Sequence, residues 1–204
     1  TCQLTINNFS QMAGNISTRA GDKGRTCIGG GARVDKDDVR VECLGDLDEA
    51  NSAIGLLRSK LENEHPWVNG LLRIQTEMMN LMAHVATPSK INPRPQSPLP
   101  VESSAWMEVW MEEIETSLTD ATDHILAGGN EVCAICQMAR TITRRAERRL
   151  VALHKVDPVD PSILQFVNRL SDLFFKLCRQ ESYQKGLSEK RWRRFRPNQS
   201  GSES

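Results

Sequence analysis

The spacing of apolar residues along the chain predicts five amphipathic helices. Apolar side chains recur every three or four residues from Leu47 to Leu61, and Asp46 is placed to cap the start of this helix. Pro66 suits the first turn of a second helix, which carries a stripe of the same period. Because such helices bury their stripes against one another, the pattern predicts an all-α bundle. The four later helices are expected over residues 66–85, 104–125, 132–155 and 163–183, the third of them burying Trp106, Val109, Trp110, Ile114 and Leu118.

Three stretches of the chain lack this periodicity. Residues 1–17 are expected to form a flexible N-terminal arm, and residues 186–204 a basic C-terminal tail. Five prolines among residues 87–104 predict a loop between helices of one domain, which we expect to span residues 18–185. The tail mixes basic and aromatic residues, a combination that can bind nucleic acid, but one short run is more typical of a solvated tail.

The overall charge narrows the classes of function. The 204 residues carry 26 basic and 26 acidic side chains, so the formal net charge is zero. This balance excludes a generally basic surface that coats nucleic acid, and no apolar run approaches the roughly 20 residues of a membrane helix. We therefore expect neither a nucleic-acid nor a membrane partner. Six scattered cysteines are most simply thiols in a reducing cytoplasm, which predicts a cytoplasmic protein.

Cys133 and Cys136 have the two-residue spacing of zinc-binding and redox pairs. The chain offers no second pair of this kind, and the stretch has the pattern of a helix. The two cysteines are therefore interpreted as small buried residues one helical turn apart. Since His65, His84 and His154 show no ligand spacing, no set of metal-binding side chains is predicted.

The fourth predicted helix gathers arginines on one face. Arg140, Arg144 and Arg148 are four residues apart, and Glu147 lies beside them. A solvated face with many salt bridges is the ordinary interpretation of such a pattern. The same helix also carries Arg145 and Arg149, and the next helix offers Asn168, Arg169 and Asp172. Planar guanidinium groups suit a polyphosphate, so this face is the first candidate for an anion site.

A glycine-rich loop over residues 18–31 is the second candidate. Its glycines allow backbone N–H groups to converge on an anion, and threonine and lysine side chains add donors. The loop lacks the glycine-lysine-serine/threonine run of a Walker A motif and does not follow a strand as the dinucleotide fingerprint does. On spacing alone, an ordinary glycine-rich turn explains it equally well.

Together, these two regions resemble one family, the ATP:cob(I)alamin adenosyltransferases of the propanediol-utilisation (PduO) type. The resemblance spans about residues 17–183 and implies a ferritin-like, up-down five-helix bundle with a glycine-rich N-terminal loop. It also implies a homotrimer with ATP and the corrinoid meeting at each subunit interface. The motifs that carry the resemblance are Thr18-Arg-Ala-Gly-Asp-Lys-Gly-Arg-Thr26, Lys36-Asp-Asp-Val-Arg-Val-Glu42, Gly45-Asp-Leu-Asp-Glu-Ala-Asn51, Ala139-Arg-Thr-Ile-Thr-Arg-Arg-Ala-Glu-Arg-Arg149 and Asn168-Arg-Leu-Ser-Asp172.

The resemblance assigns roles to individual residues. Asp48 and Arg140 match an ion pair between neighbouring subunits on which corrinoid binding depends, and Arg144 matches a nucleotide contact. Lys36 matches a lysine that reaches the phosphates. The ATP loop matches Thr18, Arg19, Gly21, Asp22, Gly24 and Thr26, and further nucleotide contacts match Glu147, Arg148 and Asn168.

The reaction that the resemblance implies is attack of Co(I) on the ribose 5′ carbon of ATP, with triphosphate as the leaving group. Magnesium is expected to bridge the triphosphate oxygens. The family also holds cobalt four-coordinate, with a phenylalanine beneath the corrin ring. This chain instead has His124-Ile-Leu-Ala-Gly-Gly129 there, so His124 either ligates cobalt, packs as a non-ligating wedge, or points elsewhere.

Two other functions remain open from the sequence. A corrinoid carrier or chaperone with weak transferase activity is consistent with the histidine at position 124. A helical bundle that associates with RNA or DNA would use the arginine helix and the basic tail instead. If the protein is the transferase, a reductase that supplies Co(I) and an acceptor enzyme that uses adenosylcobalamin are possible partners.

Overall fold

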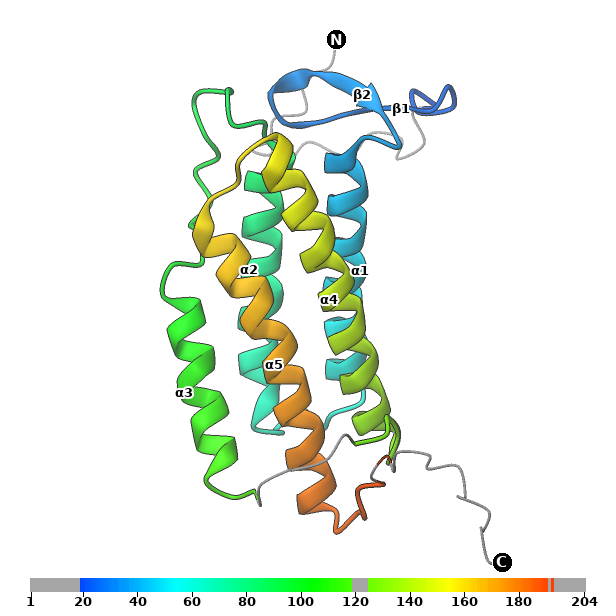
Figure 1. The fold of residues 1–204 in the computed structure, drawn as a ribbon, viewed down its shortest axis with the longest axis vertical. Coiled ribbons are helices and arrows are strands. Elements are labelled where there is room, and N and C mark those ends of the chain that lie inside the picture. The colour runs from blue at the N-terminus through cyan, green and yellow to red at the C-terminus, as the bar shows by residue number, and fades with distance from the viewer. Residues whose placement is uncertain (1–18, 119–124, 191, 193–204) are drawn as a thin grey trace, which may run out of the picture.

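The computed structural model describes residues 19–118, 125–190 and 192, and it consists mainly of long helices beside one short hairpin (Figure 1). The predicted all-α class is confirmed. The helices are α1 (Val39–Ser59), α2 (Trp67–Ala86), α3 (Ser103–Glu115), α4 (Glu131–Val156) and α5 (Pro161–Gln184). The hairpin consists of β1 (Arg25–Cys27), the 3-10 turn η2 (Gly29–Gly31) and β2 (Arg33–Asp35), with the strands antiparallel.

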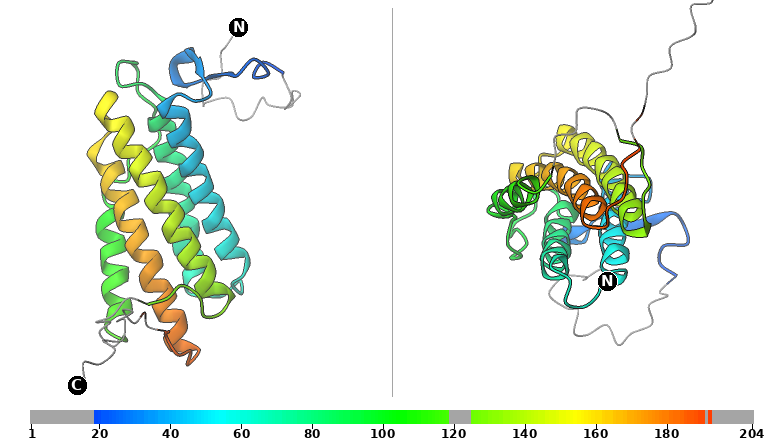
Figure 2. Two further views of the ribbon diagram at one scale, coloured as in Figure 1. Left: turned by 45° about the vertical axis from the view of Figure 1, so that its right-hand side comes forward. Right: turned by 90° about the horizontal axis from the view of Figure 1, so that it is seen from below.

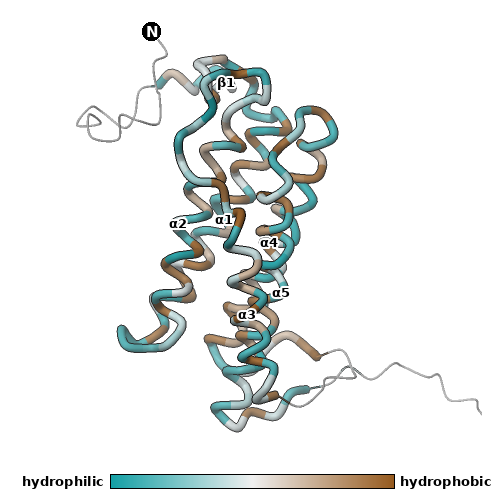
Figure 3. Tube along the Cα trace, turned by 90° about the vertical axis from the view of Figure 1, so that its left-hand side faces the viewer, coloured by the Kyte–Doolittle hydropathy of each residue, from teal (hydrophilic) through white to brown (hydrophobic). Residues whose placement is uncertain are grey.

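Four helices run side by side along the long axis, and α3 packs on the outside of α5 (Figures 1 and 2). The α4 helix contacts both α5 and α1, and α1 in turn contacts α2. Hydrophobic and hydrophilic residues alternate along the helices in Figure 3, as the apolar stripes predict. The stripes meet in one core, where Leu47, Ile54, Phe166 and Phe174 are fully buried.

The first helix begins earlier than predicted. Asp38, rather than Asp46, is the N-cap residue, and its carboxylate accepts a hydrogen bond from the Arg40 backbone N–H at 2.8 Å. The apolar pattern does not include Arg40, because this residue is charged. Its side chain is nevertheless buried, where it pairs with Asp157 and donates to the carbonyl of Val85. As a result, Glu42, Asp46, Asp48 and Glu49 lie on α1, and among the described residues all but Asp48 pair with arginines of a neighbouring helix.

The third helix ends at Glu115, less than one turn before Leu118, so its predicted extent to residue 125 is wrong over the described residues. Hydroxyl groups compete for the carbonyls of the last turn: Thr116 donates to Glu113 at 2.7 Å, and Ser117 donates to Ile114 at 2.8 Å. Val109 is 53% exposed rather than buried. Residues 119–124 lie outside the described residues.

The glycine-rich hairpin lies at the end of the bundle, beside the start of α1 (Figure 1). Two of its glycines allow a close approach to the segment after α2. A Cβ atom added at Gly29 would lie 2.3 Å from Thr87 Oγ1 and 2.8 Å from Thr87 Cα, and one at Gly30 would lie 2.9 Å from the Ile91 side chain. The absence of side chains at these two glycines therefore allows the hairpin to pack against the segment after α2.

The cysteines divide into two groups. Cys133 and Cys136 are fully buried free thiols on α4, which confirms their interpretation as small core residues, and Cys43 and Cys178 are also buried and free. Burial raises the pKa of the Cys43 thiol to about 12, so this thiol stays protonated near neutral pH. Cys27 forms a disulfide, so the expectation of thiols throughout is wrong at this position on the hairpin.

Every helix in the described part of the chain is too short or too polar to cross a lipid bilayer.

Candidate active site

The five arginines of α4 separate into two sets. Arg145 pairs with Asp46 at 3.1 Å and also with Glu49, while Arg149 pairs with Glu42 at 3.2 Å. Since all three acids belong to α1, these bridges join two neighbouring helices. The salt-bridge interpretation of the arginine pattern is therefore correct for this set.

The second set is Arg140, Arg144 and Arg148. Within the described residues, none of the three forms an ion pair. Arg144 and Arg148 are exposed, and Arg148 donates to the backbone carbonyl of Arg144 at 3.0 Å. Arg140 is half-buried, and its Nε donates to Gln137 Oε1 at 2.7 Å. This face keeps positive charge available for an external anion.

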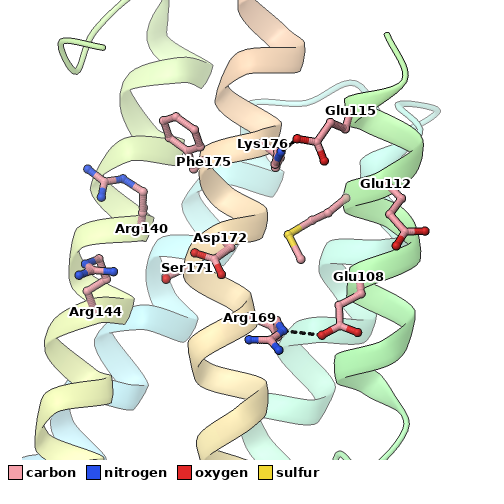
Figure 4. A pocket seen from close by; sticks show the side chains of 11 residues that line it. Glu108, Glu112, Glu115, Arg140, Arg144, Arg169, Ser171, Asp172, Phe175 and Lys176 are labelled. Carbon is pink, nitrogen blue, oxygen red and sulfur yellow. Dashed lines mark hydrogen bonds and ion pairs between the residues drawn. The ribbon is translucent and has the colours of Figure 1, made fainter. Parts of the chain in front are cut away.

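A cavity of about 440 Å³ opens beside Arg140 and Arg144 (Figure 4). In Figure 4 the two arginines project from α4, the glutamates lie on α3, and α5 runs between them. Basic side chains of α5 pair with two of the glutamates. Glu108 accepts a hydrogen bond from Arg169 at 2.5 Å. Lys176 pairs with Glu115 and holds the pKa of Glu115 below its ordinary value. The full lining is Glu108, Met111, Glu112, Glu115, Arg140, Arg144, Arg169, Ser171, Asp172, Phe175 and Lys176.

The predicted contacts on α4 and α5 meet in a hydrogen-bonded chain. Asn168 Nδ2 donates to Glu147 Oε1 at 2.8 Å, and Arg169 donates to Asn168 Oδ1 at 2.9 Å. Because Arg169 also holds Glu108, the chain fixes the amide orientation of Asn168 and connects α3, α5 and α4. The structure thus brings together Glu147 and Asn168, which are far apart in the sequence.

The predicted ATP loop forms a compact turn closed by Lys36. The Lys36 backbone N–H donates to the Gly24 carbonyl at 2.8 Å, and Gly24 N–H donates to the Gly21 carbonyl at 3.1 Å. Gly21 lies against the Lys36 side chain, because an added Cβ would be 3.2 Å from Lys36 Nζ. Arg19 has φ 55° and Gly24 has φ 73°, so both residues adopt the left-handed conformation that closes the turn. Asp22 is exposed on this turn, and Thr26 lies on β1.

A single chain does not bring all the predicted residues together. None of the described hairpin residues lines the cavity beside Arg144. Asp48 is exposed on α1, and no ion pair joins it to Arg140 within the described part of the chain. Thr18 and His124 lie outside the described residues.

Comparison with known proteins decides the family. The family model described as cobalamin adenosyltransferase matches residues 16–181. The chain belongs to the cobalamin adenosyltransferase family. It is 36% identical over 182 residues to the corrinoid adenosyltransferase of Bacillus subtilis, covering 88% of this chain and 92% of the relative. It is 32% identical over 179 residues to the human corrinoid adenosyltransferase MMAB, covering 86% of this chain and 72% of the relative.

Solved structures of this adenosyltransferase family share the fold. A variant of the PduO-type ATP:corrinoid adenosyltransferase from Lactobacillus reuteri, complexed with cobalamin and ATP, has a TM-score of 0.84 and 31% identity. The match covers 88% of this chain and all of that chain. A phenylalanine-to-histidine variant of the same enzyme, also complexed with cobalamin and ATP, matches with a TM-score of 0.84 and 32% identity, covering 88% of this chain and 97% of that chain.

Several residues that line the cavity of this adenosyltransferase, or that contact a residue lining it, were missed by sequence reasoning. Glu108, Glu112 and Glu115 have helical spacing on α3, which was a usable signal, but a run of acids usually marks a solvated face. Gln137 was missed because one amide in a helix carries no pattern. Its position three residues before Arg140 was the signal that could have found it.

Proposed function

We propose that this protein transfers the 5′-deoxyadenosyl group of ATP to cob(I)alamin, giving adenosylcobalamin and triphosphate. The observation that carries the proposal is the pair Arg140 and Arg144, which line a cavity and have no ion-pair partner among the described residues. Family membership supports it, as do relatives whose structures hold cobalamin and ATP.

In the proposed reaction, the electron pair of Co(I) forms the Co–C bond to the ribose 5′ carbon. The bond from that carbon to oxygen breaks, and triphosphate leaves with the electron pair. The protein therefore has to hold ATP with its 5′ carbon facing cobalt and to stabilise the charge on the leaving group. We assign the second task to Arg144 and Arg148, whose guanidinium groups are exposed on one face of α4.

The glycine-rich turn supplies the other side of the proposed nucleotide site. The ammonium of Lys36, which lies beside Gly21, would hold the phosphates. Glu147 and Asn168, already joined to each other, would contact the nucleoside. The remaining residues assigned to this side are Thr18, Arg19, Gly21, Asp22, Gly24 and Thr26.

We infer a homotrimer with active sites between subunits. In one chain the hairpin lies at the end of the bundle (Figure 1), whereas Arg144 lines a cavity to which no described hairpin residue contributes (Figure 4), so a second chain is needed to complete the site. Asp48 is exposed, and Arg140 is half-buried and forms no ion pair among the described residues, so the two can pair across the interface. This ion pair would support corrinoid binding.

Magnesium fits the proposed site as an ion bound mainly by triphosphate oxygens and water. Among the described residues, no three His, Cys, Asp or Glu side chains gather as a metal site. The carboxylate of Glu147, which lies on the same helix as the arginine face and accepts from Asn168, would supply a protein oxygen ligand. When bound, magnesium would neutralise phosphate charge together with Arg144.

His124 takes the position of the family's lower-face phenylalanine in this proposal, beneath the corrin ring, as a wedge that does not ligate cobalt. A related enzyme with one phenylalanine exchanged for histidine holds both cobalamin and ATP, so such an exchange is compatible with binding both. We place the reaction in the cytoplasm, with a reductase upstream and an adenosylcobalamin-dependent enzyme downstream.

Turnover tests the proposal directly. The protein is incubated with ATP, magnesium and chemically reduced cobalamin, and the light-sensitive Co–C product is followed by absorption. Formation of adenosylcobalamin together with triphosphate is expected. Tight cobalamin binding without product would favour a carrier instead, and salt-sensitive binding of RNA or DNA with no effect of ATP would favour the nucleic-acid alternative.

A further inference from the structure

One buried polar side chain connects the arginine face to a second cavity. Gln137 on α4 is only 5% exposed, and a buried amide needs partners for both its oxygen and its nitrogen. Its Oε1 accepts from Arg140 Nε at 2.7 Å, and its Nε2 donates to Cys178 Sγ on α5 at 3.4 Å. Both ends of the amide are therefore occupied within the chain.

These partners permit only one orientation of the amide. Arg140 Nε–H is a donor without acceptor capacity, so the amide oxygen has to face it. Burial raises the pKa of Cys178 to about 12, so near neutral pH its sulfur is a neutral thiol that accepts a weak hydrogen bond. Rotating the amide by half a turn would place its NH₂ group against the arginine donor. Gln137 thus holds Arg140 in a defined direction.

Gln137 also lines a second cavity, of about 230 Å³, together with Cys178. The cavity is enclosed by the loop Ile125–Gly129 and the segment Leu187–Lys190, and the Leu126 N–H donates to the Lys190 carbonyl at 2.8 Å. Arg140, in turn, lines the candidate active-site cavity. A single side chain therefore lines the cavity bounded by this loop and also contacts Arg140, an arginine of the candidate active site.

We propose that Gln137 is a positioning residue that pre-orients the Arg140 guanidinium for its ion pair and links it to the cavity lined by the loop Ile125–Gly129. The inference rests on the proposed adenosyltransferase function for the identity of that ion pair. An arginine side chain loses considerable rotamer freedom when it forms an ion pair. A guanidinium whose Nε–H is already hydrogen-bonded has fewer rotamers to lose, so its pairing costs less conformational entropy. The remaining N–H groups of Arg140 stay available to a carboxylate.

The test replaces Gln137 by methionine, which keeps the length of the side chain and removes both hydrogen bonds. The KM for cobalamin is expected to rise roughly fivefold to tenfold, with the KM for ATP within about twofold of wild type. Gln75→Met is the matched control. Gln75 lies on α2 and accepts a hydrogen bond from Arg58 at 2.6 Å, so this substitution breaks the same kind of contact away from both cavities. It should leave both KM values unchanged.

A double-mutant cycle decides whether Gln137 acts through Arg140. The variant with both Gln137→Met and Arg140→Ala should lose no more corrinoid affinity than Arg140→Ala alone. Additive losses, or an unchanged KM for cobalamin in Gln137→Met, would overturn the proposal while leaving the transferase function intact.

A second readout does not depend on turnover. The ¹⁵N Nε–H signal of Arg140, assigned by its loss in Arg140→Lys, should shift and exchange faster with water in Gln137→Met. If the wild-type protein makes no adenosylcobalamin, the proposed function fails and this signal alone decides the positioning role. An unmoved signal overturns that role, and a moved signal supports it.

Discussion

Arg144 and Arg149 are identical side chains on one helix, but they differ in their neighbours. Arg149 pairs with Glu42, whereas Arg144 is exposed without an ion pair among the described residues. Arg144→Ala should therefore raise the KM for ATP by roughly tenfold or more, since a charge-assisted hydrogen bond contributes about 1.5–3 kcal/mol. Initial rates over a range of ATP concentrations measure this. Arg149→Ala is the control and should leave the KM for ATP within about twofold; equal effects of the two variants would contradict the assignment.

Arg40 and Asp157 form an ion pair whose two members differ in burial. The Arg40 side chain is 6% exposed and that of Asp157 is 24% exposed. Asp157→Asn should cost about 3 kcal/mol of unfolding free energy, because a buried guanidinium loses its counter-charge. Arg40→Met should cost less, because it leaves a carboxylate with hydrogen bonds from Ser89 and partial access to water. Denaturant unfolding of both variants measures the difference, and a larger loss in Arg40→Met would show that burial does not set the cost.

The same pair predicts a dependence of stability on pH. Burial opposes ionisation of Asp157, but hydrogen bonds from Ser89 and the guanidinium groups of Arg40 and Arg94 outweigh it and hold the pKa of Asp157 below its ordinary value. Its contribution to stability is therefore full above the unfolded pKa of about 3.9 and is lost as the pH falls through the lower folded pKa. The stability difference between wild type and Asp157→Asn should accordingly be constant from pH 6 to 7 and shrink at acid pH. A difference that grows on acidification would contradict this.

At the scale of elements, the hairpin depends on one close contact. A methyl group at Gly29 would lie 2.8 Å from Thr87 Cα and 2.9 Å from the Ala86 carbonyl, so backbone atoms block it. Gly29→Ala should therefore move the hairpin and with it the turn that carries Gly21 and Lys36. The KM for ATP is expected to rise several-fold, with about 1–3 kcal/mol of destabilisation. Adding Thr87→Ala should not restore it, whereas the exposed change Ala32→Ser should have no effect; rescue by Thr87→Ala would mean that the hydroxyl alone is the obstacle.

The elements also show what the sequence can predict. The α2, α4 and α5 helices are long and strongly periodic, and their predicted bounds agree with the structure to within two residues. The start of α1 was missed because a buried charged residue, Arg40, interrupts the apolar pattern, and the end of α3 was missed because hydroxyl groups terminate it. Within the candidate site, the arginine pattern was visible, but its division into paired and unpaired members was not. That division depends on which acids of α1 face α4, which is tertiary information.

At the scale of the whole molecule, the zero net charge is a sum over separated regions. Acids are concentrated between residues 35 and 49 and arginines between residues 140 and 149, and only part of each group forms ion pairs with the residues that the structure describes. Asp48 and Arg140 are left over on neighbouring helices. We therefore expect equilibrium sedimentation to give the mass of a trimer, about three times the 22.9 kDa of one chain. A monomer at micromolar concentration would contradict the interface.

Mixing two inactive variants tests whether the site is shared between subunits. Asp48→Ala and Arg140→Ala should each bind corrinoid poorly, because each removes one member of the proposed ion pair. In a mixed trimer, an Asp48→Ala subunit still supplies Arg140, and an Arg140→Ala neighbour still supplies Asp48, so that interface is intact. An equal mixture, unfolded and refolded together, should regain about a quarter of wild-type activity, because one in four ordered neighbour pairs combines the two intact residues. Mixing without refolding is the control. If refolding together restores no activity although trimers form, the two residues do not meet across the interface.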